Sequence, residues 1–158
     1  MPRCHLSLGS NVEPERHLRA ALRALRERFD ALVASPVYES PVIGFDGAPF
    51  WNLAVGLESD LGVDALNAWL RALEDREGRR RDVPRYADRT LDIDVVAFGP
   101  QALDRPEWQQ AFLLAPLADI EPRLPVPEGD ETVGDRWHRI QDSDEAASLK
   151  MLDVDLLD

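Results

Sequence analysis

The amino-acid sequence predicts a domain of the α+β class. Its 158 residues suit one domain, and 44% of them are hydrophobic, which is enough to supply a core. Two segments repeat apolar residues at the spacing of a helix, and four others have the pattern of strands. Because their order is strand, helix, strand, strand, helix, strand, we expect residues 1–158 to form one domain around one sheet.

The first half of the chain supplies three of these strands and one helix. Residues 3–9 predict a strand, and Pro14, a residue favoured in the first turn of a helix, is followed by a helical stripe of apolar residues. A second strand region lies at residues 31–40, where Pro36 indicates a sheet edge or a bulge. A turn-rich stretch then leads into a third strand at residues 51–59.

The second half completes the pattern and then becomes less regular. A second helix is expected at about residues 62–76, and a fourth strand at residues 88–98. This order is the split βαβ arrangement of ferredoxin-like domains, so we expect a sandwich of an antiparallel sheet with helices on one face. Residues 111–120 indicate a short buried segment, 122–131 a proline-rich loop, and 141–158 a peripheral helix or a tail.

Two acids interrupt the fourth strand. Asp92 and Asp94 are two residues apart and therefore share one face of a strand. The opposite face is expected to hold the apolar residues Leu91, Ile93, Val95 and Ala97. One interpretation is a pair of solvated acids near a strand end. The other is a magnesium site, because Mg²⁺ takes oxygen ligands and is commonly held by one or two carboxylates together with substrate phosphates.

Charge and composition limit the classes of function. The net charge of −12 argues against nonspecific nucleic-acid binding, which needs a basic surface. No apolar run reaches the roughly 18 residues of a membrane span, and the N-terminus lacks the apolar stretch of a signal peptide. Cys4 is the only cysteine and falls in the first strand, so we expect a buried thiol. We therefore expect a cytoplasmic protein that binds neither nucleic acid nor membranes.

A basic segment precedes the two acids. Six of the chain's 18 Lys and Arg residues lie in residues 76–89, namely Arg76, Arg79, Arg80, Arg81, Arg85 and Arg89. Such a cluster is often only a solvated face. Guanidinium groups also clamp phosphate oxygens, so a basic loop that leads into a two-carboxylate strand suggests a polyphosphate site. Gly78 and Pro84 indicate a loop that could close over a nucleotide, and the P-loop motif G-x-x-x-x-G-K-[ST] is not present.

Five motifs occur in the order found in a known family. They are "LGSN", "SPVYESPVIG", "PFWNLAV", "EDREGRRR" and "RTLDIDVVAFG", and "FLLAPLADIEP" is a weaker sixth. From about residue 5 to 100 the chain resembles 6-hydroxymethyl-7,8-dihydropterin pyrophosphokinase, an enzyme family of folate biosynthesis. The resemblance implies transfer of the terminal diphosphate of the co-substrate ATP to the hydroxymethyl group of a reduced pterin. It also implies release of AMP and two Mg²⁺ ions at the reacting phosphates.

The resemblance further implies which residues serve the phosphates. Asp92 and Asp94 would hold the metal ions, which neutralise charge on the reacting oxygens. Arginines of the basic segment would contact ATP phosphates, and Tyr86 would keep an aromatic lid where the family commonly has tryptophan. The implied catalytic residues are Arg79, Arg89, Asp92 and Asp94, and the implied ATP-binding residues are Glu74, Arg79, Arg81, Tyr86 and Arg89.

A pterin ring requires a different environment. A flat heteroaromatic ring favours apolar or aromatic faces and a few fixed polar groups at its edge. Phe50 and Phe112 match the family's stacking rings, although Phe112 also suits plain core packing. Asn52, a residue type disfavoured in strands, matches the amide that reads the ring edge. The rest of the implied wall consists of Gly9, Ser40, Pro41 and Ile43.

The segment after the fourth strand departs from the family pattern. It is several residues shorter, and Glu107 follows Pro106 where the family has a histidine near ATP. A carboxylate at that place would repel phosphate, unless the loop has moved into solvent. Two functions therefore stay open: an active pyrophosphokinase, or a weakly active or non-catalytic paralogue that binds pterin or nucleotide. In both cases we expect small-molecule partners, ATP and a reduced hydroxymethylpterin, and a monomer.

Overall fold

The computed structural model describes residues 1–42, 45–82, 87–127 and 130–157. Its strands are β1 (Arg3–Ser10), β2 (Asp30–Ala34), β3 (Val37–Ser40), β4 (Phe50–Glu58), β5 (Asp92–Phe98), β6 (Gln101–Ala102) and β7 (Lys150–Leu152). Its helices are α1 (Pro14–Arg28), α2 (Val63–Arg76), α3 (Ala111–Ile120), α4 (Val133–Ile140) and α5 (Asp144–Ala147), with a 3₁₀ turn, η1 (Pro106–Gln109).

The strands form one antiparallel sheet. Its order is β6-β5-β1-β4-β3-β7, and β2 pairs with β4 alongside this path. Strand β1 is central, because β4 pairs with one of its edges and β5 with the other. Helix α1 follows β1 in the chain, and α2 connects β4 to β5. Pro36 lies in the break between β2 and β3, which pair with successive parts of one edge of β4. The predicted α+β class with an antiparallel sheet is confirmed.

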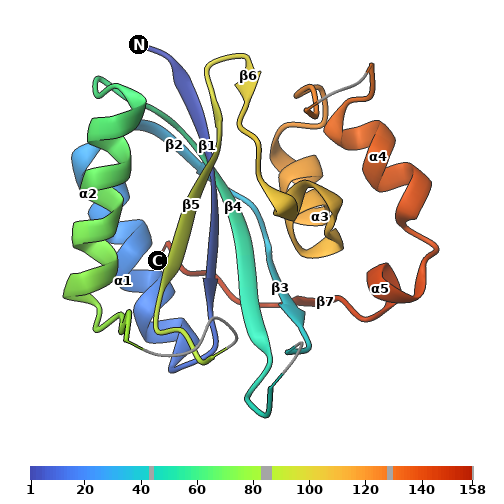
Figure 1. Ribbon diagram of the computed structural model, residues 1–158, viewed down its shortest axis with the longest axis horizontal. Coiled ribbons are helices and arrows are strands. Elements are labelled where there is room, and N and C mark those ends of the chain that lie inside the picture. The colour runs from blue at the N-terminus through green and yellow to red at the C-terminus, as the bar shows by residue number, and fades with distance from the viewer. Residues whose placement is uncertain (43–44, 83–86, 128–129, 158) are drawn as a thin grey trace.

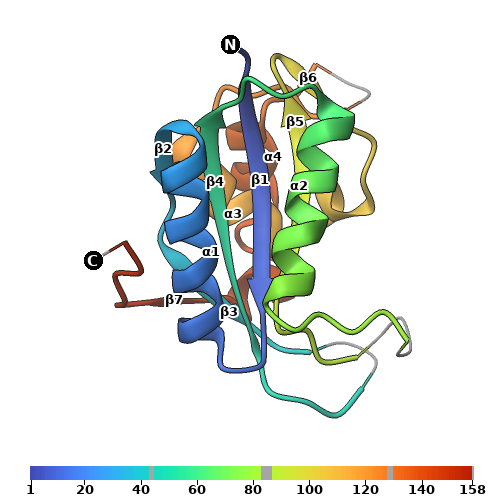
Figure 2. The same cartoon turned by 90° about the vertical axis from the view of Figure 1, so that its left-hand side faces the viewer.

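Helices α1 and α2 pack together on one face of the sheet (Figure 1, Figure 2). Helix α1 begins at Pro14, as predicted. The two helices bury apolar stripes that include Leu18, Leu22, Leu25, Leu66, Leu70 and Leu73. They meet the strand residues Leu6, Leu8, Leu53, Val55, Ile93 and Val95. The predicted helices on this face are therefore confirmed, and their apolar stripes form the main core.

The opposite face of the sheet carries α3 and α4 (Figure 1), an additional layer that includes the short buried segment expected from the sequence. Its core includes Ala54, Val96, Ala97, Trp108, Leu113, Leu117 and Val133. The expectation that Ala97 shares a face with Val95 was wrong. The register of β1 against β5 shifts between His5 and Leu6, and Val96 is the extra residue, so Ala97 turns to the α3 side.

Cys4 lies in β1 and is fully buried. Burial raises the pKa of its thiol, which disfavours the reactive thiolate. The predicted core thiol is therefore confirmed.

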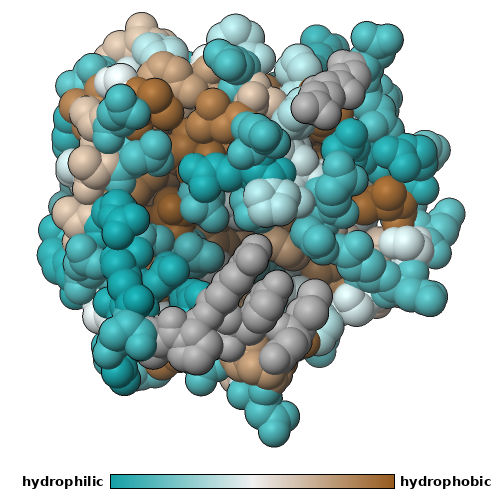
Figure 3. Space-filling view, in the orientation of Figure 1, coloured by the Kyte–Doolittle hydropathy of each residue, from teal (hydrophilic) through white to brown (hydrophobic). Residues whose placement is uncertain are grey.

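The face seen in Figure 3 is largely hydrophilic, especially around α4 and along the lower end of α2. Apolar residues gather near the upper end of the sheet in this view. In the whole chain acidic residues outnumber basic ones by 30 to 18, so the protein is strongly anionic. Within the described residues, the helices are too short or too polar to cross a bilayer.

The end of the chain wraps around one edge of the sheet. Strand β7 pairs with β3, and the following residues cross to the α1 face (Figure 1, Figure 2). There Leu156 is buried in the main core, and Arg26 Nη1 donates a hydrogen bond to the Leu157 carbonyl at 3.0 Å. We call residues 143–157 the C-terminal strap. The sequence predicted a helix or a tail for this region and missed the strand.

Candidate active site

A pocket of about 420 Å³ lies on the α3 face of the sheet. Strands β1, β3, β4 and β5 contribute to its floor, and η1, α3 and the C-terminal strap contribute to its walls. The lining includes the following residues that the sequence had singled out: Gly9, Ser40, Pro41, Phe50, Asn52, Arg89, Asp92, Asp94 and Phe112. Residues from four strands and a helix, far apart in the sequence, therefore meet in one cavity.

Strand register builds a polar row across the floor. Asp92 on β5 is opposite Gly9 on β1, and Gly9 is opposite Asn52 on β4. Asp94 is opposite Ser7, two residues further along β1. Because residues two apart share a face, both aspartates and Asn52 point to the face that α3 covers. The carboxylates are therefore neither core residues nor scattered surface acids; they lie in the pocket.

Asn52 defines one end of the pocket. It is buried, and its Nδ2 donates to Ser40 Oγ at 2.8 Å. A Cβ atom at Gly9 would lie 3.4 Å from Asn52 Oδ1 and 3.8 Å from the Phe50 ring. A Cβ there would make ordinary contact with both side chains and fill the space against them, so glycine keeps that space open for a bound ring.

Two aromatic side chains reach this end from different elements. Phe50 begins β4, and Phe112 lies in the first turn of α3, where it also packs against the second core. Pro41, which follows β3, lies in the same lining. The wall residue Ile43 that the sequence implied falls outside the described residues. An aromatic ring could thus be contacted from both the sheet and the helix, as stacking requires.

The other end of the pocket carries excess negative charge. Burial, with repulsion from Asp92 and Glu107, raises the pKa of Asp94 to about 7. Arginines offset part of the charge: Arg105 Nη1 lies 3.4 Å from Asp94 Oδ1, and Arg79 Nη1 lies 3.1 Å from Asp92 Oδ1. The raised pKa shows that the compensation is incomplete at Asp94. Such a site favours a bound cation.

Glu107 belongs to the same charged end. It lies in η1 and lines the pocket, and its Oε2 atom is buried without a hydrogen-bond partner among the described residues. Burial raises the pKa of its carboxyl group, and the charge of Asp92 raises it further. The shortened loop has therefore not moved away into solvent, and Glu107 faces the pocket beside the aspartates.

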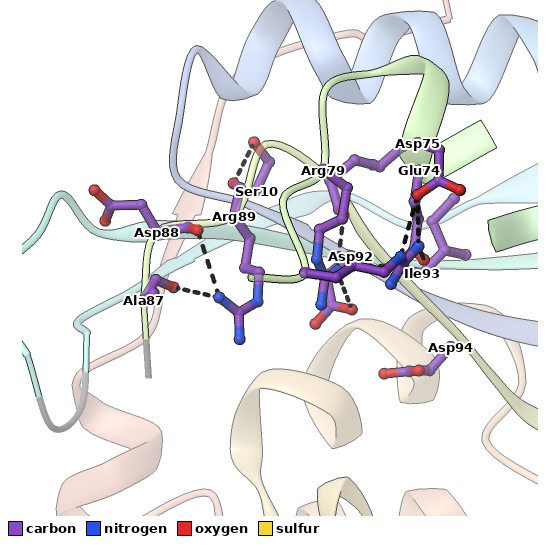
Figure 4. Close-up of polar contacts among 12 residues, drawn as sticks. Ser10, Glu74, Asp75, Arg79, Ala87, Asp88, Arg89, Asp92, Ile93 and Asp94 are labelled. Carbon is purple, nitrogen blue, oxygen red and sulfur yellow. Dashed lines mark hydrogen bonds and ion pairs between the residues drawn. The ribbon is translucent and has the colours of Figure 1, made fainter. Parts of the chain in front are cut away.

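Glu74 connects the basic segment to strand β5, which carries the two candidate metal ligands (Figure 4). Its side chain is only 6% exposed, and Oε2 accepts hydrogen bonds from the Ile93 amide at 2.8 Å and from Arg79 Nη1 at 3.3 Å. Oε1 accepts from Arg81 Nη2 at 2.9 Å. Figure 4 shows Arg79 between Glu74 and Asp92. Glu74, Arg79 and Arg81 are not among the described residues that line the pocket, so their implied contacts with ATP stay predictions.

Arg89 reaches the pocket at the end of the basic segment, and Asn11 holds its backbone. The Arg89 amide donates to Asn11 Oδ1 at 2.8 Å, and the Asn11 amide donates to the Arg89 carbonyl at 3.0 Å. Asn11 Nδ2 also donates to Asp88 Oδ1 at 2.8 Å and to the Ala48 carbonyl at 3.0 Å. The "LGSN" motif thus places Arg89 through its asparagine, a role the sequence did not reveal. The implied lid residue Tyr86 falls outside the described residues.

Several residues of the site were missed from the sequence. Arg105 contacts Asp94 and lies two residues before Glu107. It could have been found from the sequence as the cation nearest to Glu107, the position at which the chain departs from the family pattern. Glu145, Ser148 and Leu149 line the pocket from the C-terminal strap. Their position depends on β7, a three-residue strand whose pairing has no clear signal in the sequence.

Comparison with known proteins places the chain in a family. Residues 5–122 match the family model described as 7,8-dihydro-6-hydroxymethylpterin-pyrophosphokinase (HPPK). The 2-amino-4-hydroxy-6-hydroxymethyldihydropteridine pyrophosphokinase of Pseudomonas aeruginosa is 41% identical over 140 residues, which cover 80% of this chain and 85% of that protein. The protein of the same name from Bacillus subtilis is 31% identical over 128 residues, which cover 73% of this chain and 76% of that one.

Solved structures agree in fold. The crystal structure of Plasmodium falciparum HPPK-DHPS with pteroate aligns with a TM-score of 0.75 at 11% identity, and the alignment covers 96% of this chain. This chain spans 46% of that longer chain, so the likeness concerns one part of it and shows the fold alone. The family model and the two bacterial relatives go further. On their evidence, the chain belongs to the 7,8-dihydro-6-hydroxymethylpterin-pyrophosphokinase family of enzymes.

Proposed function

We propose that this enzyme transfers diphosphate from ATP to the hydroxymethyl group of 6-hydroxymethyl-7,8-dihydropterin, in a Mg²⁺-dependent reaction of folate biosynthesis that releases AMP. One observation carries the proposal: the row Asn52, Gly9 and Asp92 joins an aromatic end and a carboxylate end within a single pocket. A ring bound at the first end can therefore present a substituent to phosphates bound at the second. The names of the bacterial relatives support the same acceptor.

The aromatic end would bind the pterin. Phe50 and Phe112 offer faces for stacking, and Asn52 offers a polar group at the ring edge. With the ring fixed, the pterin hydroxyl oxygen attacks the β-phosphorus of ATP. The bond from that phosphorus to the oxygen shared with the α-phosphate breaks, AMP leaves with that oxygen, and the hydroxyl proton passes to solvent. Positioning of the two substrates in one pocket supplies much of the rate enhancement.

The carboxylate end would hold Mg²⁺ and the phosphates. Asp92 and Asp94 fit this ion, because they lie on one face in the pocket with incompletely compensated charge, and Mg²⁺ commonly combines one or two carboxylates with phosphate oxygens. We propose two Mg²⁺ ions, which when bound would neutralise charge on the reacting phosphates. Arg89 lines the pocket and would contact phosphate oxygens through its guanidinium group. Further ATP contacts are proposed for Glu74, Arg79, Arg81 and Tyr86.

A weakly active or non-catalytic pterin-binding paralogue is less well supported. A protein that only binds a pterin gains nothing from a half-buried carboxylate whose ionisation is unfavourable, and Asp94 is such a group. We propose small molecules as the partners, and we expect a monomer that acts in the cytoplasm.

The decisive test is product identification. Purified protein is incubated with ATP, Mg²⁺ and reduced hydroxymethylpterin, and nucleotides are separated by chromatography. We expect AMP and pterin diphosphate in equal amounts, only when all three components are present. ADP as the nucleotide product, or AMP formed without pterin, would contradict the proposal. Pterin binding without AMP formation would favour the non-catalytic paralogue.

A further inference from the structure

The C-terminal strap borders the aromatic end of the pocket. Leu149 lines the pocket and directly precedes β7, whose Lys150 pairs with Glu39 on β3. The next residue of β3 is Ser40, whose hydroxyl accepts the hydrogen bond of Asn52. The strap therefore lies next to the residues that would bind the pterin. The family match ends at residue 122 and assigns nothing to this part of the chain.

The strap is fixed on both sides of the sheet. On the α3 side, Glu145 Oε1 accepts a hydrogen bond from the Ala111 amide at 2.8 Å. On the α1 side, Leu156 is 5% exposed and packs in the main core. Strand β7 connects these two anchors along the edge of the sheet (Figure 1). A segment held at both ends can act as a permanent wall of the pocket.

The bond from Glu145 acts on the helix that carries Phe112. Ala111 is the first residue of α3, and Gln110, the residue at the N-cap, makes no side-chain capping bond. The first amides of a helix have no partner within the helix, and a carboxylate is favoured there by the helix dipole. Glu145 therefore supplies the missing acceptor from another element. Phe112 is the next residue and lines the pocket.

We propose that Glu145 is a positioning residue for the acceptor substrate: it holds the first turn of α3, and with it the Phe112 ring, while the strap closes that end of the pocket. The inference rests on the proposed function in taking a reduced pterin as the ligand. It predicts that the strap affects pterin binding and leaves the phosphate end unchanged, because Glu145 accepts its hydrogen bond from α3 and, among the described residues, has no hydrogen bond or ion pair with β5.

The test uses variants of the whole 158-residue chain. Glu145→Ala removes the acceptor, Glu145→Gln keeps an oxygen that can accept from Ala111, and Asp144→Ala removes the neighbouring exposed acid of α5 as a matched control. Dissociation constants for reduced hydroxymethylpterin and for ATP with Mg²⁺ are measured by calorimetry. We expect Glu145→Ala to weaken pterin binding about five- to tenfold, with ATP binding within about twofold of wild type. Glu145→Gln and Asp144→Ala should resemble wild type.

A second measurement does not depend on the ligand. Hydrogen exchange followed by mass spectrometry should show faster exchange over residues 111–114 in Glu145→Ala and unchanged exchange in Glu145→Gln. Unchanged exchange in the alanine variant, equal pterin affinities, or equal losses for pterin and ATP would overturn the positioning role. Failure of the wild type itself to bind pterin would instead count against the proposed function, and the exchange result would still decide whether Glu145 holds α3.

Discussion

The two ends of the pocket differ in how completely their polar groups are paired within the protein. At the acceptor end the Asn52 side chain donates a hydrogen bond to Ser40, and Gly9 and Phe50 line the pocket beside it. At the phosphate end the pKa of Asp94 is raised to about 7, and Glu107 has a buried oxygen without a partner among the described residues. One end is therefore ready for a neutral ring. The other carries negative charge that a bound cation would offset.

The difference suggests how the two substrates depend on the fold. Neutral packing at the acceptor end is built by strand register and by α3, so it should be sensitive to size and shape. Charges at the phosphate end interact over longer distances, so substitutions there should act through charge. The predictions below change one end at a time, and the binding measurements ask whether the other end responds.

The largest effect is expected from Asp94→Asn. A neutral amide is a poor ligand for Mg²⁺, so turnover should fall by at least about a hundredfold, while circular dichroism shows a folded protein. Asp104→Asn, which removes an exposed acid of the nearby loop, is the matched control and should retain activity. The acceptor end should be unaffected, with a pterin affinity close to that of wild type. Near-normal AMP formation by Asp94→Asn would refute the two-carboxylate assignment.

Truncation of one ring should affect the acceptor end alone. Phe50→Ala removes a stacking face and is expected to weaken pterin binding by about 1 to 3 kcal/mol, with ATP affinity nearly unchanged. Calorimetric titration of each substrate separates these effects. The reverse pattern, a loss for ATP alone, would place Phe50 on the nucleotide side.

The comparison of the two ends also explains what the sequence could predict. Asp92 and Asp94 share a face in any strand, so alternation alone brought them together, and the motifs located Phe50, Asn52 and Arg89. Alternation failed at Ala97, because a bulge depends on the pairing of two strands and has no local pattern.

Longer-range contacts of the site could not be predicted either, because they too depend on strand pairing and have no local sequence pattern. The contact of Glu145 with Ala111 joins residues 34 positions apart through a three-residue edge strand. Such a strand has too few residues for a periodic pattern. The shortened loop could be seen in the sequence, but whether Glu107 stayed beside the aspartates required the fold.

The raised pKa of Asp94 predicts a pH-dependent cost in stability when no metal is present. Between about pH 4 and pH 7 the folded protein keeps the proton of Asp94, whereas the unfolded chain has released it, so this group lowers stability as pH rises through that window. Asp94→Asn lacks the effect. In metal-free buffer the variant should equal wild type near pH 4 and exceed its free energy of unfolding by about 1 kcal/mol or more at pH 8, after allowance for solvent screening.

Denaturant titrations at both pH values test this prediction, and the acids that do not interact with Asp94 cancel in the difference. Mg²⁺ at pH 8 should stabilise wild type and have little effect on the variant. A stability difference that does not change between pH 4 and pH 8 would show that folding does not raise the pKa of Asp94.

The smallest expected effect concerns Glu107, the acid that lies where the family has a histidine. Because Glu107 lines the pocket and its charge acts on Asp94, it should oppose a bound polyphosphate even when Mg²⁺ offsets part of the charge. Glu107→His replaces an acceptor by a possible donor and should tighten ATP binding by an amount on the order of 1 kcal/mol, with pterin affinity unchanged. Glu107→Gln removes only the charge and should give part of the gain.

Titration of ATP at fixed Mg²⁺ compares the three proteins. If all three bind ATP equally, Glu107 does not face the phosphates, and the nucleotide must be held mainly by the segment from Arg79 to Arg89. If ATP binding weakens in both variants, Glu107 contributes to holding the cations, and the charged end of the pocket would then contain three acids that work together in place of two.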